Sequence, residues 1–149
     1  MMSLPTIHKV FPKSDIVWIH RDPFNSLLSY CSMVNGVWEL FFGMTDKKEV
    51  GSFVLELFDR MLKNAISYRS KVDSGIIDIN YNELIHNREK VVEELSEKIN
   101  KDIIVSNQGR ETGFFKSKYN KNKYDYGISK QEVSDKLSYY KEQFSDYLK

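Results

Sequence analysis

An arginine and a serine eight residues apart, Arg21 and Ser29, are the side chains whose types and spacing best suit chemistry with an anion. Arginine offers paired N–H donors that match the oxygens of a phosphate group. If the arginine ends a strand and a helix follows, the serine lies about two helical turns farther on. A fixed guanidinium and a hydroxyl that converge on one face of the turn predict a phosphate-binding site.

The residues around this pair predict a strand, a tight turn and a helix. Residues 16–19 are a short apolar run typical of a buried parallel strand. Charged residues follow at once, and Pro23 suits the first turn of a helix. Apolar side chains then recur at helical spacing at Phe24, Leu27, Leu28 and Cys31. Because ligands of open α/β sheets bind at the carboxyl ends of the strands, Arg21 is well placed to contact one.

A second strand is predicted over residues 76–81, followed by a polar turn near Asn87 and a helix from about Arg88 to Asn100. Tyr81 ends this strand. Taken alone, it is expected to lie at the edge of the core with its hydroxyl in water.

The Arg-Asp-Pro triplet at residues 21–23, with Ser29 behind it, resembles the sulfotransferase family. Two further stretches resemble bacterial-type members in the same order: Tyr-Asn-Glu-Leu at 81–84, and residues 123–129 before a last helix with Tyr140 and Phe144. The resemblance implies that Arg21 and Ser29 hold the 3′-phosphate of 3′-phosphoadenosine 5′-phosphosulfate (PAPS), the sulfonate donor. It also implies that Tyr81 lies against the adenine, for which a flat aromatic face is suited.

The resemblance therefore predicts a sulfotransferase that moves a sulfonate group from PAPS to an acceptor hydroxyl or amine, without a metal. The implied fold is α/β: part of a three-layer P-loop-type fold, rich in helix, with two or so short parallel strands. We expect residues 1–149 to form one domain, the C-terminal part of a sulfotransferase-like domain. The acceptor is not specified.

The family's glycine-containing phosphate loop and its catalytic base both lie upstream of the Arg-Asp-Pro element. About twenty residues precede Arg21, so we expect this chain to supply only the donor half-site, to be inactive alone, or to need a partner chain. No catalytic residue is assigned. His8 and His86 are expected at the surface, and His20 is expected to shape the turn.

Composition excludes several functions. A net charge of +1 argues against wholesale nucleic-acid binding, and the single cysteine, Cys31, excludes an internal disulfide and is expected to be buried. No apolar run is long enough to span a membrane, and the first residues lack the apolar core of a signal peptide. A soluble, cytoplasmic protein is expected.

The remaining chain predicts mostly helix. We expect helices over about 1–11, from an Asp46 cap to about Lys71, and from a Ser129 cap to the end, with Gly36 ending or bending the helix behind Pro23. Residues 38–42 form an aromatic cluster that is expected to pack in the core, or alternatively to line the acceptor pocket. The basic stretch 109–123 is expected to be solvated surface, with a flap over the nucleotide as the alternative.

A rival interpretation remains open. In it the chain is a non-catalytic, α-rich interaction or regulatory domain, and Arg21, Ser29 and Tyr81 are structural. The two hypotheses differ in one observable, because only a nucleotide site should bind adenosine 3′,5′-bisphosphate.

Overall fold

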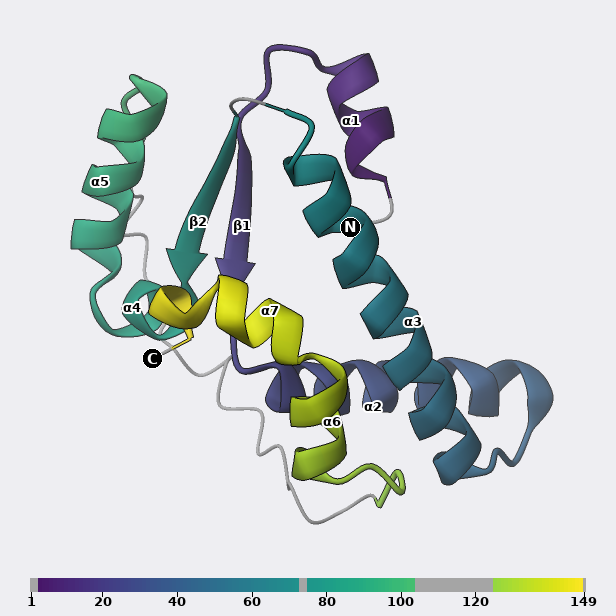
Figure 1. Ribbon diagram of the computed structural model, residues 1–149. Coiled ribbons are helices and arrows are strands. Elements are labelled where there is room, and N and C mark those ends of the chain that lie inside the picture. Colours follow the sequence, from purple (N-terminus) through teal and green to yellow (C-terminus); the bar gives the residue numbers. More distant parts are fainter. Residues whose placement is uncertain (1–2, 73–74, 104–124, 149) are drawn as a thin grey trace.

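The computed structural model describes residues 3–72, 75–103 and 125–148 and is built around a parallel sheet (Figure 1). Strand β1 (Ile16–His20) pairs with β2 (Ile76–Asn80), and the register runs from Ile16 opposite Ile76 to His20 opposite Asn80. Because the strands are parallel and in step, both end at the same edge of the sheet. The predicted α/β class, with much helix and two short parallel strands, is confirmed.

Helices surround this sheet. Figure 1 shows α5 on the β2 side, α3 on the β1 side, and α2 and α7 near the carboxyl ends of the strands. The helix α2 packs against α3 and α6. The helical bounds are α1 Leu4–Val10, α2 Pro23–Phe42, α3 Lys47–Arg69, α4 Tyr81–His86, α5 Arg88–Ile99, α6 Lys130–Lys136, α7 Ser138–Gln143 and a 3-10 turn Ser145–Tyr147.

Local capping signals explain where several helices begin. The Asp46 carboxylate accepts a hydrogen bond from the Lys48 amide and caps α3, as expected. Ser129 starts α6 with a reciprocal capping box that involves Glu132, also as expected. These caps satisfy backbone N–H groups that the first turn of a helix leaves without partners.

The core joins α2, α3 and the C-terminal helices. Cys31 is fully buried there, as predicted. Burial disfavours the thiolate and raises the pKa of Cys31 to about 11. Other apolar side chains with almost no exposed surface come from the same three segments: Leu27, Val50, Val54, Ala65, Val133 and Leu137.

Two expectations about α2 were wrong: that Gly36 ends the helix, and that the cluster at 38–42 packs in the core. The helix does not end at Gly36 but continues to Phe42 and stops before Gly43, whose φ of +81° suits glycine. The cluster at 38–42 is not core: Trp38 packs against the core, while Leu40, Phe41 and Phe42 are more than two-thirds exposed. A cluster of apolar residues in a helix does not show by itself which of them pack against another element.

Two other boundaries also differ from the prediction. Strand β2 ends at Asn80, and Tyr81 begins the short helix α4, because the Asn80 side chain accepts hydrogen bonds from the Asn82 and Glu83 amides. The last predicted helix is divided into α6, α7 and the 3-10 turn. The basic stretch 109–123 lies outside the described residues. No helix in the described part is both long and apolar enough to cross a membrane.

Candidate functional site

Arg21 and Tyr81 meet at the carboxyl edge of the sheet. Arg21 directly follows β1 and Tyr81 directly follows β2, and the register places the last residues of the two strands opposite each other. The guanidinium carbon of Arg21 lies 4.6 Å from the centroid of the Tyr81 ring, within cation–π range. The fold thus brings together two predicted site residues that are sixty positions apart in the sequence.

The Arg-Asp-Pro triplet has a simple structural meaning. Arg21 leaves the strand, Asp22 caps α2, and Pro23 occupies the first helical position. The Asp22 carboxylate accepts hydrogen bonds from the Asn25 amide at 2.8 Å and from the Asn25 side chain at 2.7 Å. The triplet therefore fixes the point at which the chain turns from strand to helix, and Arg21 stands at that point.

Ser29 lies on the same helix and is exposed. At the helical rise of about 1.5 Å per residue it stands about 9 Å along α2 from Pro23. By the same measure Trp38, the first residue of the cluster considered for the acceptor pocket, is about 22 Å from Pro23. Ser29 is thus at the Arg21 end of α2, whereas the aromatic cluster is at the opposite end.

An open groove of about 380 Å³ begins next to Arg21. Its wall on α2 is formed by residues 22–24, and the opposite wall comes from α6 and α7, including Lys130, Ser134 and Lys141. Lys141 Nζ donates a hydrogen bond to Ser134 Oγ at 2.8 Å. Two lysines, Lys130 and Lys141, thus line the wall of this groove that faces residues 22–24.

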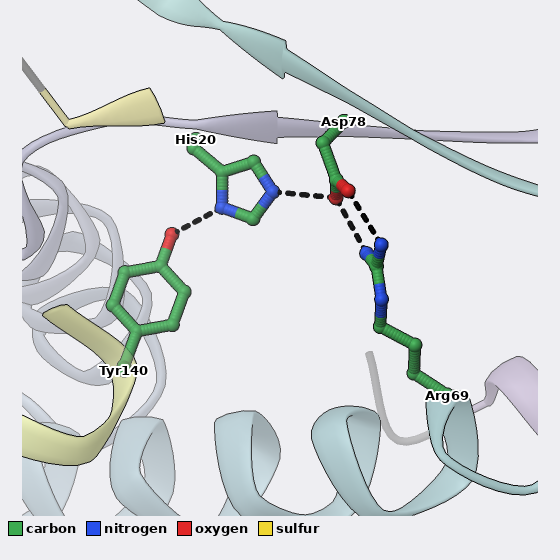
Figure 2. A network of polar contacts seen from close by, with 4 residues as sticks. All are labelled: His20, Arg69, Asp78 and Tyr140. Atoms are coloured by element: carbon green, nitrogen blue, oxygen red, sulfur yellow. Dashed lines mark hydrogen bonds and ion pairs between the residues drawn. The ribbon is translucent and has the colours of Figure 1, made fainter. Parts of the chain in front are cut away.

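A network of polar contacts joins His20, Asp78, Arg69 and Tyr140 next to this edge (Figure 2). His20, the last residue of β1, contacts Asp78 of β2 through Nε2 at 2.8 Å and the hydroxyl of Tyr140 on α7 through Nδ1 at 2.8 Å. Arg69, at the end of α3, donates two parallel hydrogen bonds to the two Asp78 oxygens, each at 2.5 Å. Four elements are therefore tied together by four side chains.

Electrostatics fix the protonation states within the network. Burial lowers the pKa of His20, and the bond to Asp78 offsets this only in part, so the ring is neutral near pH 7. Since a carboxylate only accepts, Nε2 carries the proton and Nδ1 accepts from Tyr140. Burial by itself would raise the pKa of Asp78, but hydrogen bonds from Arg69 and His20 outweigh it and hold the pKa below its usual value.

His20 is inaccessible to a substrate. Its side chain has no exposed surface, and the ring stacks on Phe144 at a centroid distance of 4.3 Å and on Trp18 at 5.1 Å. The expectation that His20 shapes the turn missed this role, because its partners are 58 and 120 residues away in the sequence. His20 ends the strand two positions after Trp18, so both side chains point to the same face of the sheet, which is the buried one.

The other two histidines lie elsewhere. His86 is exposed, as expected, whereas His8 is half-buried and its Nδ1 lies 2.8 Å from the Tyr68 hydroxyl. Among the described residues, no group of three histidine, cysteine, aspartate or glutamate side chains is arranged to hold a metal ion.

Comparison with protein families gives one match. A model described as the sulfotransferase family matches residues 1–102, which is about two-thirds of the chain. This stretch includes Arg21, Ser29 and Tyr81, and three of the four network residues. Comparisons with curated proteins and with solved structures find no match.

Proposed function

Because this chain belongs to the sulfotransferase family, we propose that it binds the nucleotide of the sulfonate donor PAPS at the carboxyl edge of its sheet. In this proposal Arg21 and Ser29 contact the 3′-phosphate, and the Tyr81 ring lies against the adenine. The chain then serves as the donor half of a site for sulfonate transfer to an acceptor hydroxyl or amine.

The contact between Arg21 and Tyr81 is the observation that carries the proposal. A nucleotide with a 3′-phosphate presents an anion and a flat base. This pair offers a guanidinium for the anion and, 4.6 Å from it, an aromatic ring for the base. Arg21 lies over one face of the Tyr81 ring, and in this proposal the adenine lies against the other face.

Arg21 also has its charge available. It is exposed, and no carboxylate among the described residues forms an ion pair with it. By contrast, Arg69 is committed to Asp78 through both nitrogens of its fork. Of these two arginines near the strand ends, Arg21 is the one that can bind an incoming phosphate.

When bound, PAPS supplies the sulfonate group, and the protein's part is to hold and orient the nucleotide. Sulfonate transfer also requires a base to accept the acceptor's proton. His20 is excluded from this role by its burial. The residues proposed here therefore account for donor binding only.

Calorimetric titration with two nucleotides tests the proposal. We expect adenosine 3′,5′-bisphosphate to bind at least about tenfold more tightly than adenosine 5′-monophosphate, because a charge-assisted hydrogen bond contributes about 1.5–3 kcal/mol. The Arg21→Ala variant should lose this preference. Arg60→Ala, which removes an exposed arginine from α3, serves as the matched control and should retain it.

Three results would contradict parts of the proposal. If the wild-type protein binds neither nucleotide, the rival hypothesis of a non-catalytic domain is favoured. If it binds both equally, no 3′-phosphate site exists. If Arg21→Ala and Arg60→Ala behave alike, the phosphate contact lies elsewhere on the chain.

A further inference from the structure

The described sheet has only two strands, so its backbone pairing gives limited control over where the strand ends lie. His20 and Asp78 add a diagonal link, because Asp78 is two residues before the Asn80 that lies opposite His20. A link of this kind resists sliding of one strand end along the other. His20 immediately precedes Arg21, and Asp78 is three residues before Tyr81.

The link is itself held from both sides. The planar fork of Arg69 fixes the orientation of the Asp78 carboxylate and attaches it to α3. The Tyr140 hydroxyl fixes the His20 ring from α7, and Phe144 packs against the ring face. Hydrogen bonds that are shielded from water and connected in series are strengthened by their surroundings. The His20 and Asp78 side chains thus have one well-defined arrangement.

If His20 only stabilised the fold, it would not need partners from several elements. A buried histidine needs partners for its two nitrogens, which backbone groups could provide. Here the partners come from three different elements, and the network ends one residue from the proposed phosphate contact. Nothing in the local sequence around Arg21 could fix its position relative to Tyr81, since the two residues follow different strands.

We propose that the network of His20, Asp78, Arg69 and Tyr140 is a positioning device that holds Arg21 beside Tyr81 in the nucleotide site. This inference rests on the proposed function for its biological meaning, but its structural content is independent of any ligand. Its members are positioning residues, since they act through Arg21 and Tyr81; His20 and Tyr140 are buried, whereas Arg69 is partly exposed.

Two substitutions at His20 distinguish its contact with Asp78 from its contact with Tyr140. In His20→Gln the amide nitrogen can take the place of Nε2 and still donate to Asp78, whereas in His20→Asn the shorter side chain reaches only the Nδ1 position near Tyr140. We expect His20→Gln to keep the affinity for adenosine 3′,5′-bisphosphate within about threefold of wild type. His20→Asn should weaken it by about tenfold or more, the size expected when a binding group is misplaced.

A measurement without ligand makes failure of this inference distinguishable from failure of the proposed function. The nuclear Overhauser effect between the Arg21 side chain and the Tyr81 ring should persist in wild type and His20→Gln and disappear in His20→Asn. If wild type binds the nucleotide but His20→Asn keeps both the affinity and the Overhauser effect, the positioning inference is wrong. If no protein binds while the Overhauser effect follows the expected pattern, only the proposed function fails.

Thermal unfolding of each variant shows whether it is folded. Should His20→Asn not fold, Tyr140→Phe addresses the same question, because it removes only the hydroxyl that orients the His20 ring and keeps the aromatic packing. We expect Tyr140→Phe to weaken both the Overhauser effect and nucleotide affinity, the latter by about threefold. Unchanged values in a folded Tyr140→Phe protein would overturn the inference.

Discussion

Replacing each of two helical glycines with alanine should have opposite effects on stability. Gly51 lies in α3 against the segment that leads into α6: a Cβ added to it would come within 2.1 Å of the Tyr126 carbonyl oxygen and 3.0 Å of the Ile128 side chain. Gly36 lies in α2, and a Cβ added there would meet nothing within 4 Å. The same chemical change therefore tests two very different surroundings.

The magnitudes follow from these contacts. Alanine is favoured over glycine inside a helix by about 0.5–1 kcal/mol, so Gly36→Ala should raise the free energy of unfolding by about that amount. At Gly51 the obstructing atom belongs to the backbone and cannot rotate away, so the overpacking cost of about 1–3 kcal/mol outweighs the helical gain. Because the helical gain is common to both variants, they should differ by the overpacking cost, about 1–3 kcal/mol.

Urea denaturation followed by circular dichroism provides the assay, with equal m values as the condition for comparing midpoints. A Gly51→Ala variant as stable as Gly36→Ala would show that residues 126–128 do not pack on α3. The placement of α7, and with it the contact between Tyr140 and His20, would then lose its support.

Two further predictions concern buried titratable groups. Burial lowers the pKa of His20 in the native protein, so the unfolded chain binds the extra proton first as the pH falls. The free energy of unfolding should therefore fall as the pH drops below about 6.5. The slope should be at most about 1.4 kcal/mol per pH unit until the native pKa is reached. Denaturation at several pH values should show this slope in wild type and not in His20→Gln, and parallel curves for the two proteins would contradict the assignment. Burial raises the pKa of Cys31 to about 11, so a colorimetric thiol reagent at pH 8 should react slowly with the native protein and promptly in denaturant; prompt reaction of the native protein would show that Cys31 is accessible.

Features that depend on nearby residues were predictable from the sequence. The apolar run at 16–19, the proline at the start of α2 and the caps at Asp46 and Ser129 each act within a few residues, and the structure confirms the elements they indicate. The start of α4 was missed, although Asn80 followed three residues later by Glu83 is a local signal typical of a helix N-terminus.

Features that depend on distant contacts were not predictable. The roles of His20 and Asp78 depend on partners from separate elements, and no spacing in the sequence reports that Tyr140 would reach His20. Likewise, Phe41 and Phe42 are exposed although they are hydrophobic, because burial depends on whether another element packs against the end of α2. The Arg21–Tyr81 contact lies between these cases, since strand ends of a parallel sheet share one edge but their side chains need not touch.

The most direct test of the central claim is to map adenosine 3′,5′-bisphosphate onto the protein by nuclear magnetic resonance. With assigned backbone amides, the nucleotide should shift the signals of residues 21–22, Ser29 and 80–82 most strongly, and in Arg21→Ala these shifts should require at least about tenfold more nucleotide. Shifts concentrated at the opposite end of the sheet, near Ser14 and Gly75, or no shifts at all, would contradict the assignment of a nucleotide site to this edge.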